Sequence, residues 1–446
     1  MSKESDQPRP SRIPESLRAL RHRNYRLFIS GQLVSLTGSW VQNTALGWLV
    51  YNVLTHSSTY LGWFNFAWQI PVLVLGLFAG ALADSVNRHR LIIMTQFCFM
   101  VHAIILTVMT LTHGEGGLPW ITYSGTLILA LCSGIFQAFD MPARQAFLLQ
   151  MVPARDLSNA VALNSLTFNI ARIVGPSIAG AVIATFESMH PERLALGEGV
   201  CFLLNTLTYS AVLWSLFQMR VPQAPVTKVG ASERFRYMTD GVRYVKRHQH
   251  VRALMTHLVF MALFGIPYLI LIPVYAREVL GGQATEFGTL MTAVGVGAVA
   301  GGIIMTRRKS IKGLGSHMGR CVFGVVLMLV LLSLNRNYTL AILLLAVAGF
   351  FMVMAMIASQ TLVQTVLPED IRGRVMSIYS MISVGCLPFG SLLSGSMAEN
   401  FGVGRTFQIN AVVCAVVTAY FTARLPVLRQ SALRTREYRQ AIGLTD

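Results

Sequence analysis

One arginine and one aspartate could carry charge or move a proton inside an otherwise apolar chain. Arg172 is the only charged residue well inside a long apolar stretch, and Asp140 lies at the end of the preceding stretch. A guanidinium at such a depth is costly and normally faces a cavity or a partner. Arg172 could therefore bind an anionic group, relay a proton to Asp140, or form a structural ion pair with it. Asp140 could also pair locally with Arg144.

Polar and aromatic side chains within the apolar stretches are candidates for binding a small molecule. The candidates are Trp40, Gln42, Asn43, Gln69, Gln137, Asn169, Arg172, Tyr268, Gln360 and Tyr379. Amides and rings without many ions suit a neutral or weakly charged ligand of mixed polarity. A single amide is better explained as an interhelical hydrogen bond, worth about 0.6 kcal/mol on average. The run of polar residues on the first stretch favours a cavity.

No residue pattern predicts a metal site, a cofactor or an enzyme. The six cysteines are scattered through apolar stretches, without a CxxC pair or histidines at ligand spacing. The chain has no HExxH, GxSxG or P-loop motif, which argues against a membrane-embedded enzyme and an ATP-driven pump. No segment outside the apolar stretches exceeds 33 residues, too few for the folded output domain of a sensor.

These residues must be positioned by membrane-spanning helices. The chain has 446 residues, of which 54% are hydrophobic and only 12% are charged, too few for a soluble protein of this length. A spanning helix needs about 20 mostly apolar residues. Twelve such spans are predicted, at 27–50, 59–83, 91–112, 119–139, 163–186, 199–219, 253–275, 287–306, 319–335, 339–362, 375–397 and 405–425. We expect an all-α polytopic membrane protein with twelve transmembrane helices.

The basic charge is distributed unevenly between the two sides of the membrane. Of 36 Lys and Arg residues, 31 fall on the side that holds both termini and four on the opposite side. The positive-inside rule therefore places both termini in the cytoplasm. Most of the net charge of +17 serves topology and attraction to lipid headgroups rather than binding of nucleic acid.

An internal repeat divides the chain into two halves. A shift of 226 residues places Gly62 on Gly288, and nearly the same shift places Gly76 and Gly80 on Gly297 and Gly301. Such repeats are typical of transporters built from two pseudo-symmetric bundles. The predicted division is an N-terminal segment 1–26, a six-helix bundle 27–219, a cytoplasmic linker 220–252 with an amphipathic helix, a second bundle 253–425 and a tail 426–446.

The junction between the second and third spans carries a motif from Gly80 to Arg90. It reads Gly-Ala-Leu-Ala-Asp-Ser-Val-Asn-Arg-His-Arg and resembles the signature loop of the major facilitator superfamily. The resemblance implies a gate built by Gly80, Asp84, Arg88 and Arg90, in which the glycine permits close helix contact. Ser85 replaces an arginine and Asn87 a turn glycine of that pattern, although Asn tolerates a left-handed turn.

The fifth span resembles the antiporter motif of the drug exporters in that superfamily. Gly175, Pro176 and Gly180 occupy its gating positions, whereas two of its glycines are alanines here. Small residues allow close packing, and the proline removes one backbone hydrogen bond and bends the helix. The resemblance implies that this helix pairs with its counterpart in the other half, the segment 385–395, and favours export.

Within the superfamily, residues 31–48 and 140–146 resemble the exporters of enterobactin and macrolides. The likeness extends from Leu17 to Arg424. It implies a monomeric secondary transporter of the bacterial inner membrane that exports a small amphipathic compound by proton antiport with alternating access. Uptake or facilitated transport by the same fold is the alternative. The stretch 127–134 lacks the fourth-span arginine of proton-coupled relatives, and no acidic residue lies mid-span. Asp140 beside Arg172 is the candidate proton carrier.

Overall fold

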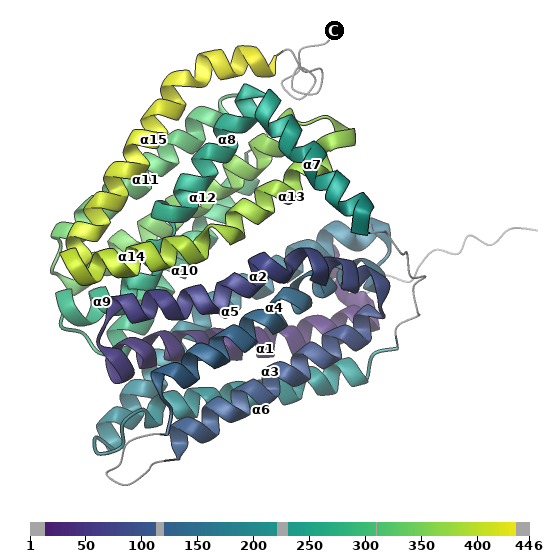
Figure 1. Cartoon of the computed structure of the whole chain (residues 1–446). Helices are drawn as coiled ribbons and strands as arrows, with labels where there is room; N and C mark the ends of the chain where they lie inside the picture. The colour runs from purple at the N-terminus through teal and green to yellow at the C-terminus, as the bar shows by residue number, and fades with distance from the viewer. Residues whose placement is uncertain (1–13, 113–119, 221–230, 309, 434–446) are drawn as a thin grey trace, which may run out of the picture.

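The computed structural model describes residues 14–112, 120–220, 231–308 and 310–433, and within these ranges the chain is helical without a β-strand. The predicted segments 1–26 and 426–446 therefore lie partly outside the described residues. Figure 1 shows two bundles of long helices, one above the other.

The first bundle consists of six long helices preceded by a short 3₁₀ helix, η1 (Glu15–Arg21). Its members are α1 (Arg23–Trp48, continued by η2, Leu49–Thr55), α2 (Ser58–Ser85), α3 (Arg88–Leu111), α4 (Tyr123–Met151), α5 (Ala154–Met189) and α6 (Leu196–Phe217). Side-chain oxygens of Ser57, Asn87 and Thr122 accept hydrogen bonds from backbone N–H groups in the first turns of α2, α3 and α4. These N-caps fix the first residues of α2, α3 and α4 where the apolar runs begin.

The linker contains α7 (Ala231–Arg247), which confirms the helix predicted there. It packs on the second bundle, because Arg374 donates to the Asp240 carboxylate at 3.1 Å. The second bundle contains α8 (Gln249–Phe260) continued by η3 (Met261–Gly265), η4 (Pro267–Leu271), α9 (Ile272–Val274) and η5 (Tyr275–Val279), and then α10 (Ala284–Thr306), α11 (Leu314–Leu334), α12 (Tyr338–Val366), α13 (Glu369–Gly385) with α14 (Leu387–Phe401), and α15 (Val403–Ala432).

Twelve helical segments thus form the two bundles. Among the described residues, ten segments are long and apolar enough to cross a membrane, and α1 and α2 are the other two. Large apolar side chains such as Phe78, Leu207 and Trp214 are more than half exposed. Exposed apolar surface of this kind suits contact with lipid rather than water.

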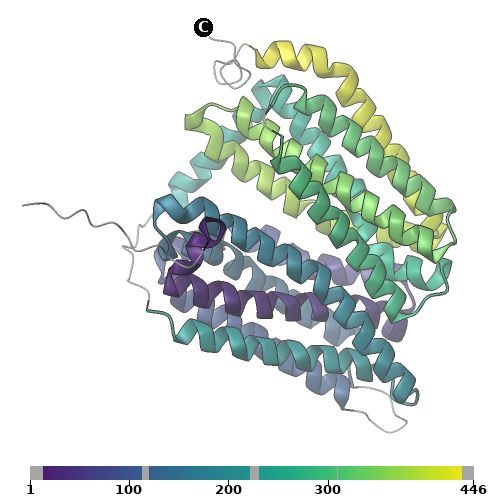
Figure 2. The same ribbon diagram turned by 180° about the vertical axis from the view of Figure 1, so that it is seen from behind.

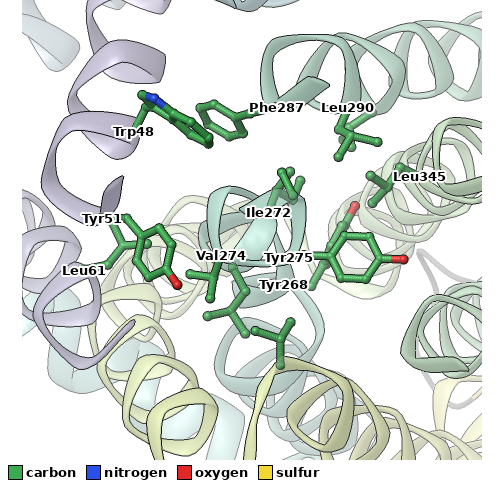
Figure 3. Packing of buried hydrophobic residues seen from close by; sticks show 14 of the residues in the cluster. Trp48, Tyr51, Leu61, Tyr268, Ile272, Val274, Tyr275, Phe287, Leu290 and Leu345 are labelled. Atoms are coloured by element: carbon green, nitrogen blue, oxygen red, sulfur yellow. The ribbon is translucent and has the colours of Figure 1, made fainter. Parts of the chain in front are cut away.

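The hydrophobic core shows where the two bundles meet. We call the end that carries α7 the near end, and the end with the loops 55–58, 189–196 and 279–284 the far end. One buried cluster joins both bundles toward the far end, whereas each bundle has a separate cluster at the near end. In Figure 3 the joint cluster brings Trp48, Tyr51 and Leu61 of the first bundle against the second. Figure 2, seen from behind, shows that the two bundles lie closer together at the far end than at the near end.

Two equivalent helix pairs hold the bundles together, α5 with α10 and α2 with α14. An added Cβ at Gly288 would lie 3.0 Å from the Cα of Gly180, and one at Gly395 would lie 3.0 Å from the Cα of Gly62. Gly62 and Gly288 are the positions that the sequence repeat matched. The pseudo-symmetry therefore relates the two contacts to each other.

The expected pairing of the fifth span with the segment 385–395 is wrong in this structure. Helix α5 packs on α10, and the segment 385–395 packs on α2. The reason is that the pseudo-two-fold axis relates α5 to α14 and α10 to α2, so the two glycine-rich helices belong to different pairs and do not pack on each other.

Candidate functional site

The structure separates the two charged residues that the sequence placed together. The Asp140 carboxylate pairs with the Arg144 guanidinium one turn along α4. It also accepts hydrogen bonds from Thr95 Oγ1 at 2.6 Å and Gln96 Nε2 at 3.0 Å, both on α3. Of the pairings left open by the sequence, the local one is present. These bonds satisfy a buried carboxylate inside the first bundle, as a buried charge requires.

Arg172 lies instead on the side of α5 that faces the second bundle. Its backbone carbonyl would lie 3.3 Å from a Cβ at Gly295 of α10, and its guanidinium interacts electrostatically with the buried Tyr268 of η4. Among the described residues, no carboxylate lies within ion-pair distance of this guanidinium. A partly buried cation at membrane depth without a protein anion is suited to receive an anionic ligand group.

The first-span candidates divide between packing and exposure. Gln42 is buried, and its Oε1 accepts a hydrogen bond from Asn205 Nδ2 of α6 at 2.8 Å. Gln42 therefore joins two helices of one bundle. Asn43 is exposed, whereas Trp40 is half-buried and packs edge-on against Phe168 of α5.

The other amide candidates occupy different settings. Gln69 of α2 donates to Ser391 Oγ of α14 at 3.3 Å, so it joins the two bundles. Asn169 donates to the carbonyl oxygen of Ser165 on its own helix at 2.8 Å. Gln137 of α4 is half-buried. Gln69 is thus the amide in this group that lies at the bundle interface.

The aromatic candidates of the second half are both buried but lie apart. Tyr268 belongs to the cluster that joins the bundles, and its hydroxyl has no hydrogen-bond partner among the described residues. Tyr379 of α13 belongs to the near-end core of the second bundle, and Gln360 of α12 is exposed. Arg172 and Tyr268 thus lie on opposite bundles, close enough for an electrostatic interaction.

The glycines of α5 allow close approach on two sides. A Cβ at Gly175 would overlap Trp40 of α1, and one at Gly180 would lie 2.7 Å from the carbonyl oxygen of Ala284 on α10. Pro176 lies between them inside the helix. This helix therefore packs tightly against its own bundle and against the opposite bundle.

The motif between α2 and α3 differs from expectation in two respects. A Cβ at Gly80 would meet no atom within 4 Å, so this glycine makes no close helix contact here. Asn87 is extended, with φ −66°, rather than left-handed, because it caps α3 by accepting from the backbone N–H of Arg90 at 3.2 Å. The side chain of Asp84 lies outside the described residues.

Sequence reasoning missed two polar contacts that close the far end. One Glu399 oxygen of α14 accepts from Ser57 Oγ at 2.9 Å and from the backbone N–H of Ser58 at 2.8 Å, at the start of α2. In the second contact, the Tyr51 hydroxyl donates to the Glu278 carboxylate. The Ser57–Ser58 pair before an apolar run signals a helix start, but nothing in the sequence indicates that a carboxylate 341 residues away binds there.

Every hydrogen bond that joins described residues of opposite bundles lies in the far half.

Comparison with known proteins agrees with this arrangement of two bundles. Residues 15–442 match the family described as transmembrane secretion effectors. The chain belongs to this family of the major facilitator superfamily. It is therefore a multi-pass membrane transporter and not an enzyme, as the sequence predicted.

Two relatives align with nearly the whole of this chain. The staphyloferrin A transporter of Staphylococcus aureus is 29% identical over 406 residues, which cover 90% of this chain and 96% of the relative. The multidrug efflux pump Tap of Mycolicibacterium fortuitum is 24% identical over 424 residues, covering 92% and 97%.

Solved structures support the fold. A bacterial homologue of the human lysosomal transporter Spinster, in an inward-facing and occupied conformation, superposes with a TM-score of 0.69 at 14% identity and covers 92% of this chain and 98% of its own. A D-xylose–proton symporter superposes with a TM-score of 0.63 at 15% identity, covering 90% and 96%. At these identities the likeness concerns the fold alone, and the twelve-helix transporter fold predicted from the sequence is confirmed.

Proposed function

We propose that this transporter exports a small amphipathic organic compound with an anionic group from the cytoplasm. The observation that carries the proposal is Arg172, a cation at the bundle interface without a carboxylate partner among the described residues. Trp40 and Gln69 would supply the aromatic and amide contacts, and Asn43, Gln137, Asn169, Gln360 and Tyr379 remain further candidates. The names of the staphyloferrin A transporter and the Tap efflux pump support export of such a compound.

Transport would proceed by alternating access. The bundles 27–219 and 253–425, joined by the linker 220–252, would rock about the close contacts of Gly175, Pro176 and Gly180 on α5. With both termini in the cytoplasm of a bacterial inner membrane, as the distribution of basic residues favours, the near end is the cytoplasmic one. The described conformation then has its outer side closed. The gate at Gly80, Asp84, Arg88 and Arg90 would close the inner side in the opposite state.

Proton antiport would supply the energy. Asp140 is our candidate carrier, and in this conformation its carboxylate is paired with the Arg144 guanidinium. Arg172 would then act on the substrate rather than on this proton. A deletion strain tests direction and energy source together: it should retain the anionic compound, and a protonophore should cause the same retention in the parent strain. Loss of uptake in the deletion strain would instead support import.

Purified protein in proteoliposomes tests the role of Arg172. We expect Arg172→Ala to raise the KM for an anionic substrate roughly 10- to 100-fold, because a hydrogen-bonded charge contributes about 1.5–3 kcal/mol. Arg172→Lys, which keeps the charge, should recover part of this loss. Arg193→Ala, an exposed arginine in the loop after α5, is the control. An unchanged KM in Arg172→Ala would refute anion binding at this residue.

A further inference from the structure

A cavity of about 120 Å³ lies at the near end of the second bundle, away from the interface between the bundles. It is formed by α8, the loop before α11, and parts of α11, α12 and α15. No residue of the candidate transport site lines it. The cavity therefore needs an explanation of its own.

The floor of this cavity is apolar. Seven of its thirteen lining residues are Leu, Val or Phe. Among them, Leu254 of α8, Leu314 of α11 and Leu428 of α15 are buried in the near-end core. An apolar floor of this kind suits hydrocarbon better than water, because water there would lack polar partners.

The rim of the cavity is cationic. Lys312, in the loop before α11, and Arg429, near the end of α15, line the same cavity although they are 117 residues apart in sequence. Both are exposed, and among the described residues neither has an acidic partner within ion-pair distance. Two cations that face one cavity repel each other unless an anion lies between them.

The backbone adds to this positive potential. The first three residues of the 21-residue helix α11, Leu314–Ser316, line the cavity, and no side chain caps this helix. Free N–H groups at a helix start attract negative charge. Arg308 holds the preceding loop in place by donating to the carbonyl oxygens of Ser310 at 3.0 Å and Lys312 at 2.8 Å.

We propose that this cavity binds an anionic phospholipid of the surrounding membrane. The phosphate lies between Lys312 and Arg429 at the start of α11, and the first carbons of one acyl chain cover the apolar floor. The rest of the chain follows α15, whose outer face exposes Val416, Tyr420 and Val427 by 62%, 61% and 52%. Free phosphate would satisfy the rim but would leave the floor uncovered. Basic pockets between helix ends are typical sites for anionic headgroups.

The test is native mass spectrometry of the purified, delipidated full chain, titrated with phosphatidylglycerol. We expect the double variant Lys312→Gln/Arg429→Gln to bind about 30-fold more weakly than the wild type, since each cation near a headgroup contributes roughly fivefold. The matched control is Lys246→Gln/Arg247→Gln, which removes the same charge from exposed positions on α7. Equal weakening in both variants, or in neither, would overturn the proposal.

Three further arms identify the ligand and the cavity. Phosphatidylcholine with the same acyl chains should bind at least tenfold more weakly than phosphatidylglycerol, and inorganic phosphate should not compete at equal concentration. Gly315→Val keeps the charges but reduces the cavity, because a Cβ there would lie 2.9 Å from Leu425 Cδ2. It should also weaken binding. Competition by inorganic phosphate, or full lipid binding by Gly315→Val, would contradict a lipid site. Because none of these measurements involves transport, the outcome is independent of the export proposal.

Discussion

Replacing Glu399 with glutamine should open the far end of the transporter. In the structure, one carboxylate oxygen of Glu399 accepts hydrogen bonds from Ser57 Oγ at 2.9 Å, Ser58 N at 2.8 Å and Ser58 Oγ at 3.1 Å. These bonds join α14 of the second bundle to the start of α2 in the first. In the alternating-access mechanism proposed above, these bonds exist only while the far end is closed, so weakening them should shift the equilibrium between closed and open states.

The size of the shift follows from the charge that glutamine removes. Hydrogen bonds to a charged group are roughly twice as strong as neutral ones, and a carboxylate at a helix start contributes about 0.3–1 kcal/mol more. Because Glu399 is an exposed residue, solvent screening reduces these gains. We expect the substitution to destabilise the closed state by about 1–2 kcal/mol, which is roughly a 5- to 30-fold change in the ratio of the two states.

Distance measurements between spin labels would detect this change. Labels at Glu192→Cys and Arg336→Cys, both exposed at the far end of opposite bundles, should report a larger population of long distances in Glu399→Gln. The six native cysteines would first be replaced by alanine. Glu286→Gln is the matched control, because the Glu286 carboxylate accepts from Gln283 N at 2.8 Å at the start of α10, within one bundle. Identical distance distributions in wild type and Glu399→Gln would refute the reasoning, and so would an equal shift in Glu286→Gln.

Two further predictions concern packing and a buried charge. Gly288→Ala would place a Cβ 2.5 Å from the carbonyl oxygen of Pro176, and overpacking of about 1–3 kcal/mol should slow transport at least fivefold in proteoliposomes. Gly302→Ala on the same helix meets no atom within 4 Å and should keep the wild-type rate. Arg144→Leu leaves Asp140 as an unpaired buried charge and should destabilise the protein by about 3–5 kcal/mol, measured by chemical unfolding. Adding Asp140→Asn should recover much of this loss, and a double variant as unstable as the single one would contradict the pair.

The class of the protein could be predicted from its sequence because lipid imposes a strict condition. A chain that crosses a bilayer must satisfy its backbone hydrogen bonds internally, so each crossing appears as a long apolar run of helical length. Composition and the twelve runs therefore indicated a polytopic helical protein. The repeat that matched Gly62 with Gly288 also predicted two related halves, since close contacts between membrane helices favour small residues such as glycine at equivalent positions.

The partners of individual polar residues were decided by tertiary structure. The sequence left Asp140 free to pair with Arg144 or Arg172, and only the rotation of α4 and α5 within their bundle determines which guanidinium lies within reach. In the same way, Gln42 faces α6 while Gln69 faces the opposite bundle. A helix that touches lipid on one side and protein on the other is apolar nearly all round. The distribution of its apolar residues therefore does not indicate which side faces which neighbour.

Contacts between residues far apart in the sequence depend on the three-dimensional structure for a further reason. Glu399 binds the start of α2 from a position 341 residues away from Ser58, and Lys312 meets Arg429 around one cavity from separate elements. Neither juxtaposition follows from local spacing, because the pseudo-symmetric packing of twelve helices sets both. The sequence alone determined that the chain spans the membrane as two related halves. The packing of the helices decided which charged and polar groups lie in contact, because ion pairs and hydrogen bonds form only over a few ångströms.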